Sequence, residues 1–460
     1  MTIRSLGRAA GALVMAAGVA LPASASADVY WYNHGTETIG RATSSGGSVV
    51  QDFLRGVDPH SLAVTNTHVY WATGSAIGRA AQDGSGATDS FLSLPPSTTV
   101  YGVAASDDHL YWTTGTTIGR VSLDGSNPRP DFLAADADAL MVEGEHLYWA
   151  DGLGGGRIGR TRLDGTAPAQ PAFITGLSNP ISLASDGTHL YGASDNAKTI
   201  GRARLDGGSP PSPTFLTDTT LAGPDSISSV AVADGYLFWG RKPGSSRTPS
   251  FVGRAKLDGS DKRPYFLPAT DPFTITAINS QAISFPTLQG TTVTAGPVPL
   301  AATASSGLPI RYSSSTPTVC RVNGSQVVLS AVGMCRVTAE QPGDARYLAA
   351  APVTRAFAVA EPPAPPPPAR PLPVSGLRAA VSKGTIRLRW TPPVDATAQT
   401  SYRVRITHKN KILSRVTMTT TAKFTRLRAK RLYTACVVTA RPDSEQFSAS
   451  RCITRRIPRR

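Results

Sequence analysis

The first 280 residues repeat one pattern of apolar and polar positions six times. Each copy has an aromatic segment of the type Leu-Tyr-Trp, a segment of the type Ile-Gly-Arg, a Phe-Leu or Phe-Ile pair, and a short apolar run, and five of the six copies have an Asp-Gly turn. These runs are too short for helices and rich in β-branched and aromatic residues. Four short strands in each copy, at a period of 37 to 47 residues, predict a six-bladed β-propeller. The positions that define the period are Tyr30, Tyr70, Tyr111, Tyr148, Tyr191 and Phe238.

The two ends of this repeat region are expected to complete one blade together. The last copy ends with an apolar run at residues 274–278, which matches the run that precedes every later aromatic segment. The first copy instead begins directly at its aromatic segment, residues 29–31. Residues 273–279 are therefore predicted to supply the innermost strand of the first blade, which removes two free sheet edges.

Two residue types recur once in most copies, and their repetition indicates structural roles, since a catalytic group needs to occur only once. The arginines are expected to pack between blades or to pair with a neighbouring carboxylate, and they are Arg41, Arg79, Arg120, Arg160, Arg202 and Arg254. The histidines precede the aromatic segments, where turn or edge positions are expected, and they are His68, His109, His146 and His189.

The repeat resembles a known propeller family. Residues 110–113 read Leu-Tyr-Trp-Thr, residues 147–151 read Leu-Tyr-Trp-Ala-Asp, and residues 118–126 follow with Ile-Gly-Arg and Leu-Asp-Gly. This is similar to the YWTD-type six-bladed propellers of the low-density lipoprotein receptor family, over residues 28–280. The resemblance implies the architecture and names no function, and the acidic end of the motif is present only at Asp151.

The rest of the chain resembles two smaller β-sandwich modules, so the expected fold class is all-β. Residues 281–360 resemble bacterial immunoglobulin-like repeats, which serve as spacers or adhesive units in exported proteins, and the likeness is carried by residues 300–310 and 315–322. Residues 361–373 are rich in proline and predict a stiff, extended linker.

Residues 374–455 resemble a fibronectin type III domain. The resemblance is carried by residues 386–393, 402–406 and 432–438, and it places Trp390 and Tyr433 at the family's core aromatic positions. Residues 456–460 form a basic tail.

Export is indicated at the N-terminus. Residues 1–27 read as a signal peptide, with Arg4 and Arg8 before an apolar stretch and with Ala25-Ser26-Ala27 fitting the cleavage rule. The mature chain is then expected to begin at Asp28, to be secreted, and to lack a later membrane span.

An exported chain with four cysteines also predicts disulfides, Cys320–Cys335 and Cys436–Cys452. Each bond is expected to stabilise its module by about 2–4 kcal/mol. A metal site is disfavoured, because neither a Cys-x-x-Cys motif nor a histidine cluster accompanies them.

The net charge of +15 is distributed unevenly. Residues 28–280 contain 18 Lys and Arg against 25 Asp and Glu, whereas residues 370–460 contain 21 against 3. The basic end favours anionic partners such as cell-surface polymers or lipid headgroups, although a solvated arginine-rich strand face is the alternative. Export and the absence of a recognition motif argue against nucleic acid as a partner.

Polar residues precede the expected inner strands of five blades, on the face where propellers commonly bind ligands. A ring of such groups can hold Ca²⁺, a cation or a sugar. Asp, Asn and Pro are equally what tight turns require, so both interpretations stay open. These candidate ligand-binding residues are Asp58, His60, Asp138, Asn179, Asp225 and Asp271.

The sequence therefore favours an exported, non-catalytic binding or adhesion protein. Its propeller would recognise an extracellular protein or a glycan, and its sandwiches would act as a spacer and a basic tether. The alternative is a propeller enzyme, either a glycan-active hydrolase or a protein similar to streptogramin lyases, whose blade phrases residues 185–191 resemble. The lyase chemistry needs a histidine paired with a metal-binding carboxylate, and the propeller's glutamates, Glu37, Glu143 and Glu145, give no such pairing.

Overall fold

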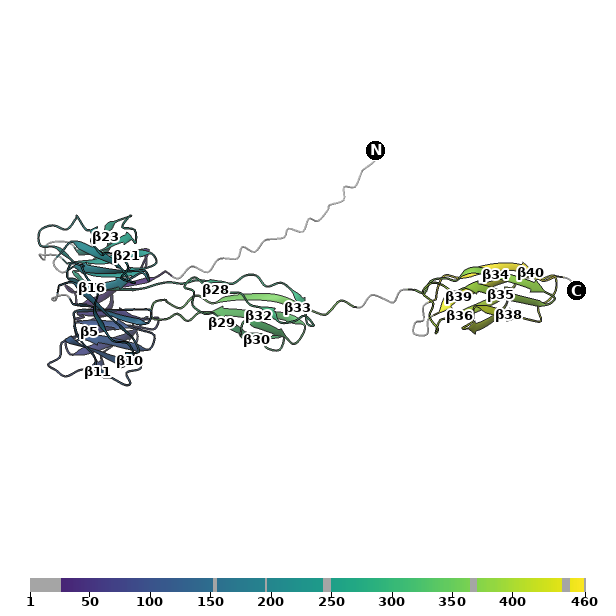
Figure 1. Ribbon diagram of the computed structural model, residues 1–460, viewed down its shortest axis with the longest axis horizontal. Helices are drawn as coiled ribbons and strands as arrows, with labels where there is room; N and C mark the ends of the chain where they lie inside the picture. The colour runs from purple at the N-terminus through teal and green to yellow at the C-terminus, as the bar shows by residue number, and fades with distance from the viewer. Residues whose placement is uncertain are drawn as a thin grey trace, which may run out of the picture. The chain divides into compact units, whose positions relative to one another are not determined.

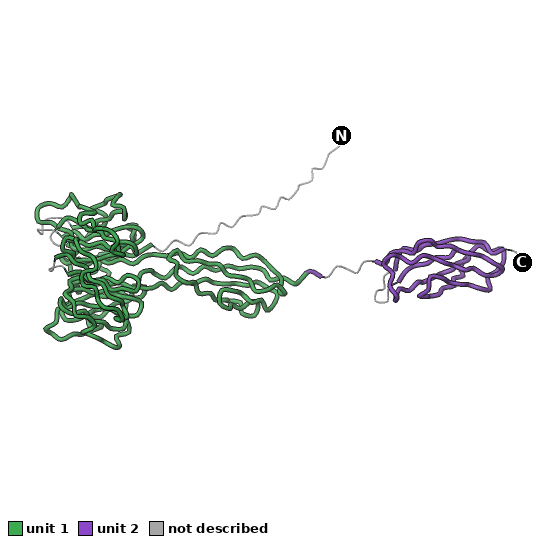
Figure 2. Tube along the Cα trace, viewed as in Figure 1, with its two compact units in different colours: residues 1–362 green, residues 363–460 purple. Residues whose placement is uncertain are grey.

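The computed structural model describes residues 26–151, 155–194, 197–242, 250–364, 370–440 and 447–458. Every regular element in these ranges is a β-strand, and no helix there is long and apolar enough to span a membrane. The chain forms two compact units, residues 1–362 and 363–460 (Figure 2). The predicted signal peptide up to residue 25, linker residues 365–369 and the last two tail residues lie outside the described residues.

The first unit begins with a six-bladed β-propeller, in which each blade is a four-stranded antiparallel sheet (Figure 1). Each inner strand contacts the inner strands of both neighbouring blades, so the six sheets close into a ring. From the inner to the outer strand, the first blade consists of β24 (Pro272–Ile278), β1 (Asp28–Asn33), β2 (Thr38–Thr43) and β3 (Val50–Arg55), and the second of β4 (Ser61–Val64), β5 (His68–Thr73), β6 (Ala76–Ala81) and β7 (Thr88–Ser93). The third blade consists of β8 (Gly102–Ala105), β9 (His109–Thr113), β10 (Gly115–Ser122) and β11 (Arg129–Ala137), and the fourth of β12 (Ala139–Glu143), β13 (His146–Asp151), β14 (Arg157–Arg162) and β15 (Gln170–Ile174). The fifth blade consists of β16 (Pro180–Ser185), β17 (His189–Ser194), β18 (Thr199–Arg204) and β19 (Ser212–Thr217), and the sixth of β20 (Ser226–Ala233), β21 (Tyr236–Lys242), β22 (Ser250–Lys256) and β23 (Arg263–Ala269).

The ring closes through the pairing of β24 with β1. Asp28 lies opposite Ile278, and the antiparallel register continues along both strands. The backbone amide of Ala27 donates to Oδ2 of Asp234 at 2.9 Å, and the amide of Ser280 donates to Oδ1 of the same carboxylate at 3.1 Å. One side chain of the sixth blade therefore holds both ends of the propeller, and the predicted closure is confirmed.

The cross-strand register explains why each copy pairs a tryptophan with a glycine. In five blades the tryptophan of the second strand lies opposite the glycine of Ile-Gly-Arg, and a Cβ atom on that glycine would overlap the indole ring. In the fifth blade Gly192 replaces the tryptophan, and Leu177 lies over Gly201 instead. The five pairs are Trp31 with Gly40, Trp71 with Gly78, Trp112 with Gly119, Trp149 with Gly159 and Trp239 with Gly253.

Five of the six repeated arginines connect neighbouring blades, as predicted. Each guanidinium lies over the phenylalanine of its own blade, 3.6 to 5.6 Å from the ring centroid. Five of the six also donate to a backbone carbonyl of the next blade. Arg254 does so across the ring closure, to the carbonyl of Ser44 at 2.9 Å, whereas Arg160 donates to Gln170 within its own blade.

A β-sandwich follows the propeller in the first unit and has a core that includes Val327, Phe357 and both cysteines. The Cys320–Cys335 disulfide is confirmed, and it connects two different sheets. The sandwich contains nine strands in three sheets. They are β25 (Ile283–Ser284) with β28 (Thr303–Ala304); β26 (Thr291–Thr292), β33 (Val353–Ala360), β32 (Gly333–Glu340) and β29 (Arg311–Ser314); and β27 (Val298–Pro299), β31 (Gln326–Leu329) and β30 (Cys320–Asn323).

The second unit is a β-sandwich of two sheets. Trp390 and Tyr433 are buried in its core, as expected, and the Cys436–Cys452 disulfide joins directly paired residues of two neighbouring strands. The strands are β34 (Ser375–Ser382), β35 (Thr385–Thr391) and β38 (Thr421–Phe424) in one sheet, and β37 (Lys411–Thr417), β36 (Ser401–His408), β39 (Leu432–Ala440) and β40 (Arg451–Arg456) in the other.

The glycine opposite each tryptophan gives a direct stability test. Gly119→Ala forces its Cβ atom into the indole of Trp112, and overpacking of this kind costs about 1–3 kcal/mol of unfolding free energy. Gly201→Ala is the matched control, because its added methyl comes closest to the far end of the Leu177 side chain, which can move, and lies 3.3 Å from the nearest backbone atom, of Pro213. Denaturant unfolding followed by tryptophan fluorescence should show the larger loss for Gly119→Ala, and equal losses would contradict the explanation.

Candidate functional site

The propeller has two distinct faces. We call the face where the inner strands begin the rim face, and the face where they end and turn into the second strands the sandwich face. All six candidate ligand-binding residues of the sequence immediately precede inner strands, so they belong to the rim face. The sandwich contacts the propeller on the opposite face, through residues 341–348, which we call the docking loop.

The docking loop is held to the propeller by main-chain contacts. Beside Tyr347, Asn279 continues the chain beyond β24, and its amide donates to the carbonyl of Arg346 at 3.0 Å. The amide of Leu348 donates back to the carbonyl of Asn279 at 2.8 Å. The amide of Ala345 donates to Oδ1 of Asp107, in the turn after β8, at 2.6 Å. The loop therefore adds a short strand segment to the end of the closing strand.

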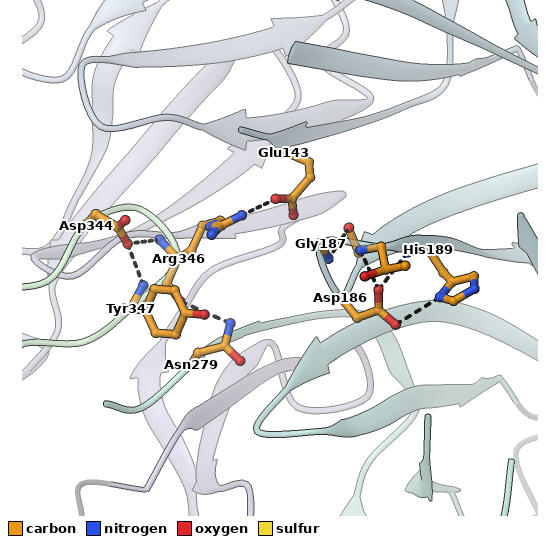
Figure 3. Close-up of polar contacts among 10 residues, drawn as sticks. Glu143, Asp186, Gly187, His189, Asn279, Asp344, Arg346 and Tyr347 are labelled. Carbon is orange, nitrogen blue, oxygen red and sulfur yellow. Dashed lines mark hydrogen bonds and ion pairs between the residues drawn. The ribbon is translucent and has the colours of Figure 1, made fainter. Parts of the chain in front are cut away.

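One ion pair completes this contact. The guanidinium of Arg346 points to the carboxylate of Glu143, which lies at the end of β12 and is largely buried (Figure 3). Oδ1 of Asp344 accepts hydrogen bonds from the amides of Arg346 and Tyr347, both at 2.8 Å, and so fixes the turn of the loop. The sandwich thus presents a preformed loop to the propeller.

A cavity of about 840 Å³ lies inside the ring, between the two faces. Residues of all six inner strands line it, and most of these lining side chains are small or aliphatic. At the sandwich end the lining comes from Ala345, Arg346 and Tyr347 of the docking loop. A ligand that enters from the rim face therefore meets a wall made by the propeller and a floor to which the sandwich contributes.

At the rim end, the cavity lining includes two polar and two aromatic side chains, unlike the small and aliphatic side chains that make up most of it. His60 and Asp138 are two of the residues that the sequence singled out. Tyr101 and Phe273 are exposed aromatic residues, which the sequence reasoning missed. The available signal in the sequence was weak: Phe273 follows the proline that begins β24, at the position where β16 has Ile181.

The other four candidates lie outside the cavity lining. Asp58 accepts a hydrogen bond from the hydroxyl of Tyr32 at 2.7 Å, and burial together with this carboxylate raises the pKa of Tyr32. Asn179 and Asp271 have φ values of 44° and 56°, in the left-handed region that Asn and Asp tolerate in turns. Asp225 is buried in its own turn, where Oδ2 accepts from the amide of Ala222 at 3.4 Å. Asn179, Asp225 and Asp271 thus have features of turn residues, whereas Asp58 connects its blade to Tyr32 of the first blade.

No group of three His, Cys, Asp or Glu side chains able to hold a metal ion occurs within the described ranges. The segment that resembles a streptogramin-lyase phrase places Nδ1 of His189 3.5 Å from Oδ2 of Asp186 (Figure 3). Burial opposes the charge of Asp186, yet hydrogen bonds from two backbone amides and the hydroxyl of Tyr191 lower its pKa. The carboxylate is thus occupied by donors of its own turn and second strand.

Comparison with known proteins identifies one module. Residues 372–453 match the family model of the fibronectin type III domain. No curated protein matches the sequence. The match and the two disulfides are typical of extracellular proteins.

The similarities to solved structures are distant. The fibronectin type III domain of human collagen alpha-1(XX) is 22% identical over 22% of this chain and 95% of that one, with a TM-score of 0.18. Domains d3–d4 of rat CD45 are 14% identical over 23% of this chain and 55% of that one, about half its length, with a TM-score of 0.18. An X-ray structure provisionally assigned as a gluconolactonase is 12% identical over 55% of this chain and 82% of that one, with a TM-score of 0.35.

The Arg346–Glu143 pair can be tested through the backbone bonds beside it. Arg346→Ala removes a partly exposed ion pair, which contributes about 1 kcal/mol or less. We expect hydrogen exchange at the amides of Asn279 and Leu348 to rise by about fivefold or less, while the sandwich core stays protected. Arg336→Ala, an exposed arginine elsewhere on the sandwich, is the control. Unchanged exchange at both amides would show that the ion pair does not hold the loop.

Proposed function

We propose that the protein is an exported binding protein that takes a glycan or a side group of an extracellular protein into the propeller cavity from the rim face. In this proposal the second unit attaches the protein to an anionic surface. The fibronectin type III match supports an extracellular binding role in general, and the propeller supplies the recognition site.

The cavity and its rim are the observation that carries this proposal. A concave site that presents polar groups beside apolar side chains is typical of ligand-binding sites. Tyr101 and Phe273 offer flat apolar surfaces, and His60 and Asp138 offer polar atoms beside them. The docking loop occupies the other end, which leaves the rim face for an incoming ligand. This lining suits a chain end or a side group better than the middle of a long polymer.

Binding can be measured with the full chain on an array of immobilised oligosaccharides and cell-wall fragments. We expect Tyr101→Ala and Phe273→Ala each to lower the affinity for the bound spots by about tenfold or more, as truncation of a central aromatic contact does. Tyr265→Ala is the matched control, because Tyr265 is an exposed aromatic on the outer strand β23, outside the cavity. Absence of binding to any spot, or equal loss in all three variants, would contradict the proposal.

Export also predicts a defined mature N-terminus. Ala27 is fully buried, its amide donates to Asp234 at 2.9 Å, and its carbonyl accepts from the amide of Ser44 at 2.7 Å. Residues 23–25, Ala-Ser-Ala, fit the cleavage rule as well as residues 25–27 do. We therefore infer that processing leaves Ser26 as the first residue and retains these contacts.

Intact mass measurement of the secreted protein checks this inference. A mass for a chain that begins at Ser26 is expected, because a chain that begins at Asp28 loses the buried alanine and both hydrogen bonds. A mass for a start at Asp28 would support the cleavage position first predicted from the sequence, and a mass that includes residues 1–25 would contradict export.

A further inference from the structure

The four-stranded sheet of the second unit has an outer face that is not covered by the sandwich core. Tyr402, Val404 and Ile406 of β36 point into the core and are buried, so the alternating residues Arg403 and Arg405 point outward. Residues that lie directly opposite each other on neighbouring strands point to the same side of the sheet. We call the outward side of β37, β36, β39 and β40 the outer sheet face.

Apolar side chains on this face are exposed. The register places Val416 of the edge strand β37 beside Arg403, and Ile412 of the same strand beside Thr407. Ile412 is 56% exposed and Val416 is 62% exposed. Phe447 also lies at this face, because the guanidinium of Arg403 covers its ring at 4.4 Å from the centroid. Clustered exposed apolar residues of this kind mark interaction surfaces.

The same sheet is strongly basic. Its four strands contain seven Lys and Arg residues and no Asp or Glu, and the register places three of the seven, Arg403, Arg405 and Arg456, on the outer sheet face. Neither Arg403 nor Arg405 forms an ion pair with a residue that the structure describes. Arg403 lies over the ring of Phe447, and together with Arg405 it gives the outer sheet face a positive charge that favours an anionic partner.

The combination of charge and exposed apolar side chains selects one class of anionic surface. A hydrated polysaccharide or teichoic-type polymer supplies negative charge but no hydrocarbon to cover Ile412 and Val416. A bilayer that contains anionic lipids supplies both, because apolar side chains enter the boundary between headgroups and acyl chains while basic side chains stay at the phosphates.

We propose that the outer sheet face binds an anionic lipid surface. Ile412, Val416 and Phe447 contact the acyl boundary, and Arg403 and Arg405 contact the lipid phosphates. This rests on the attachment role in the proposed function and specifies the surface to which the protein attaches.

The test uses the full chain and sedimentation with vesicles of phosphatidylglycerol and phosphatidylcholine, compared with phosphatidylcholine alone and with a dextran sulfate resin. The unaltered protein is expected to bind the anionic vesicles, less strongly as salt is raised. The double variant Arg403→Gln, Arg405→Gln should weaken vesicle binding by roughly fivefold for each arginine and should also weaken retention on the resin.

The apolar variant separates a lipid surface from a polymer. The double variant Ile412→Ser, Val416→Ser should lose about tenfold in vesicle affinity and keep its retention on dextran sulfate. Val394→Ser is the apolar control. Val394 is 97% exposed, belongs to the same unit and lies outside this sheet. Arg378→Gln, on β34 of the other sheet, is the basic control.

Each outcome decides a different point. If the double variant Ile412→Ser, Val416→Ser binds vesicles as tightly as the unaltered protein, the lipid proposal is overturned. An anionic polymer is then favoured as the surface, and the attachment role remains. Absence of binding to both vesicles and resin would overturn the attachment role as well. All the altered side chains are exposed, so circular dichroism of each variant should match that of the unaltered chain, and only folded variants are compared.

Discussion

The pairing of β24 with β1 is the interaction on which the rest of the structure depends. Without it, the first blade lacks its inner strand, and the inner strand of the sixth blade has no neighbouring blade on one side. Two sheet edges are then exposed. With it, the six inner strands surround a cavity and all begin on one face. Asp234 reinforces the closure, because its carboxylate binds the chain just before β1 and just after β24.

The same pairing also determines which face the sandwich covers. β24 is the last strand of the propeller, and only residues 279–282 separate its end from β25 of the sandwich. Four residues are too few to lead the chain to the other face, so the sandwich begins where the inner strands end. Asn279 therefore meets the docking loop, and the sandwich contributes to the cavity lining instead of serving only as a spacer.

Repeated and unrepeated residues have different roles in this molecule. The tryptophan and glycine pairs and the inter-blade arginines recur because each blade solves the same packing problem against the next. The residues that give the cavity its chemical character, Tyr101, Phe273 and Arg346, occur once and outside the repeated motif. Their individual positions make one end of the cavity aromatic and the other charged.

The sequence by itself determined the six blades, the closing strand, the role of the arginines and both disulfides. This was possible because short local segments encode the strands and their pairing, and these segments recur along the chain. It could not determine which rim residues face the cavity. An Asp or Asn before a strand satisfies a turn as readily as a ligand; Asn179 and Asp271 have the positive φ angles of turn residues, and Asp58 accepts a hydrogen bond from Tyr32 of the neighbouring blade. The meeting of Glu143 with Arg346, about 200 residues away in the chain, arises only when two folded modules come together, and no local pattern encodes such a contact.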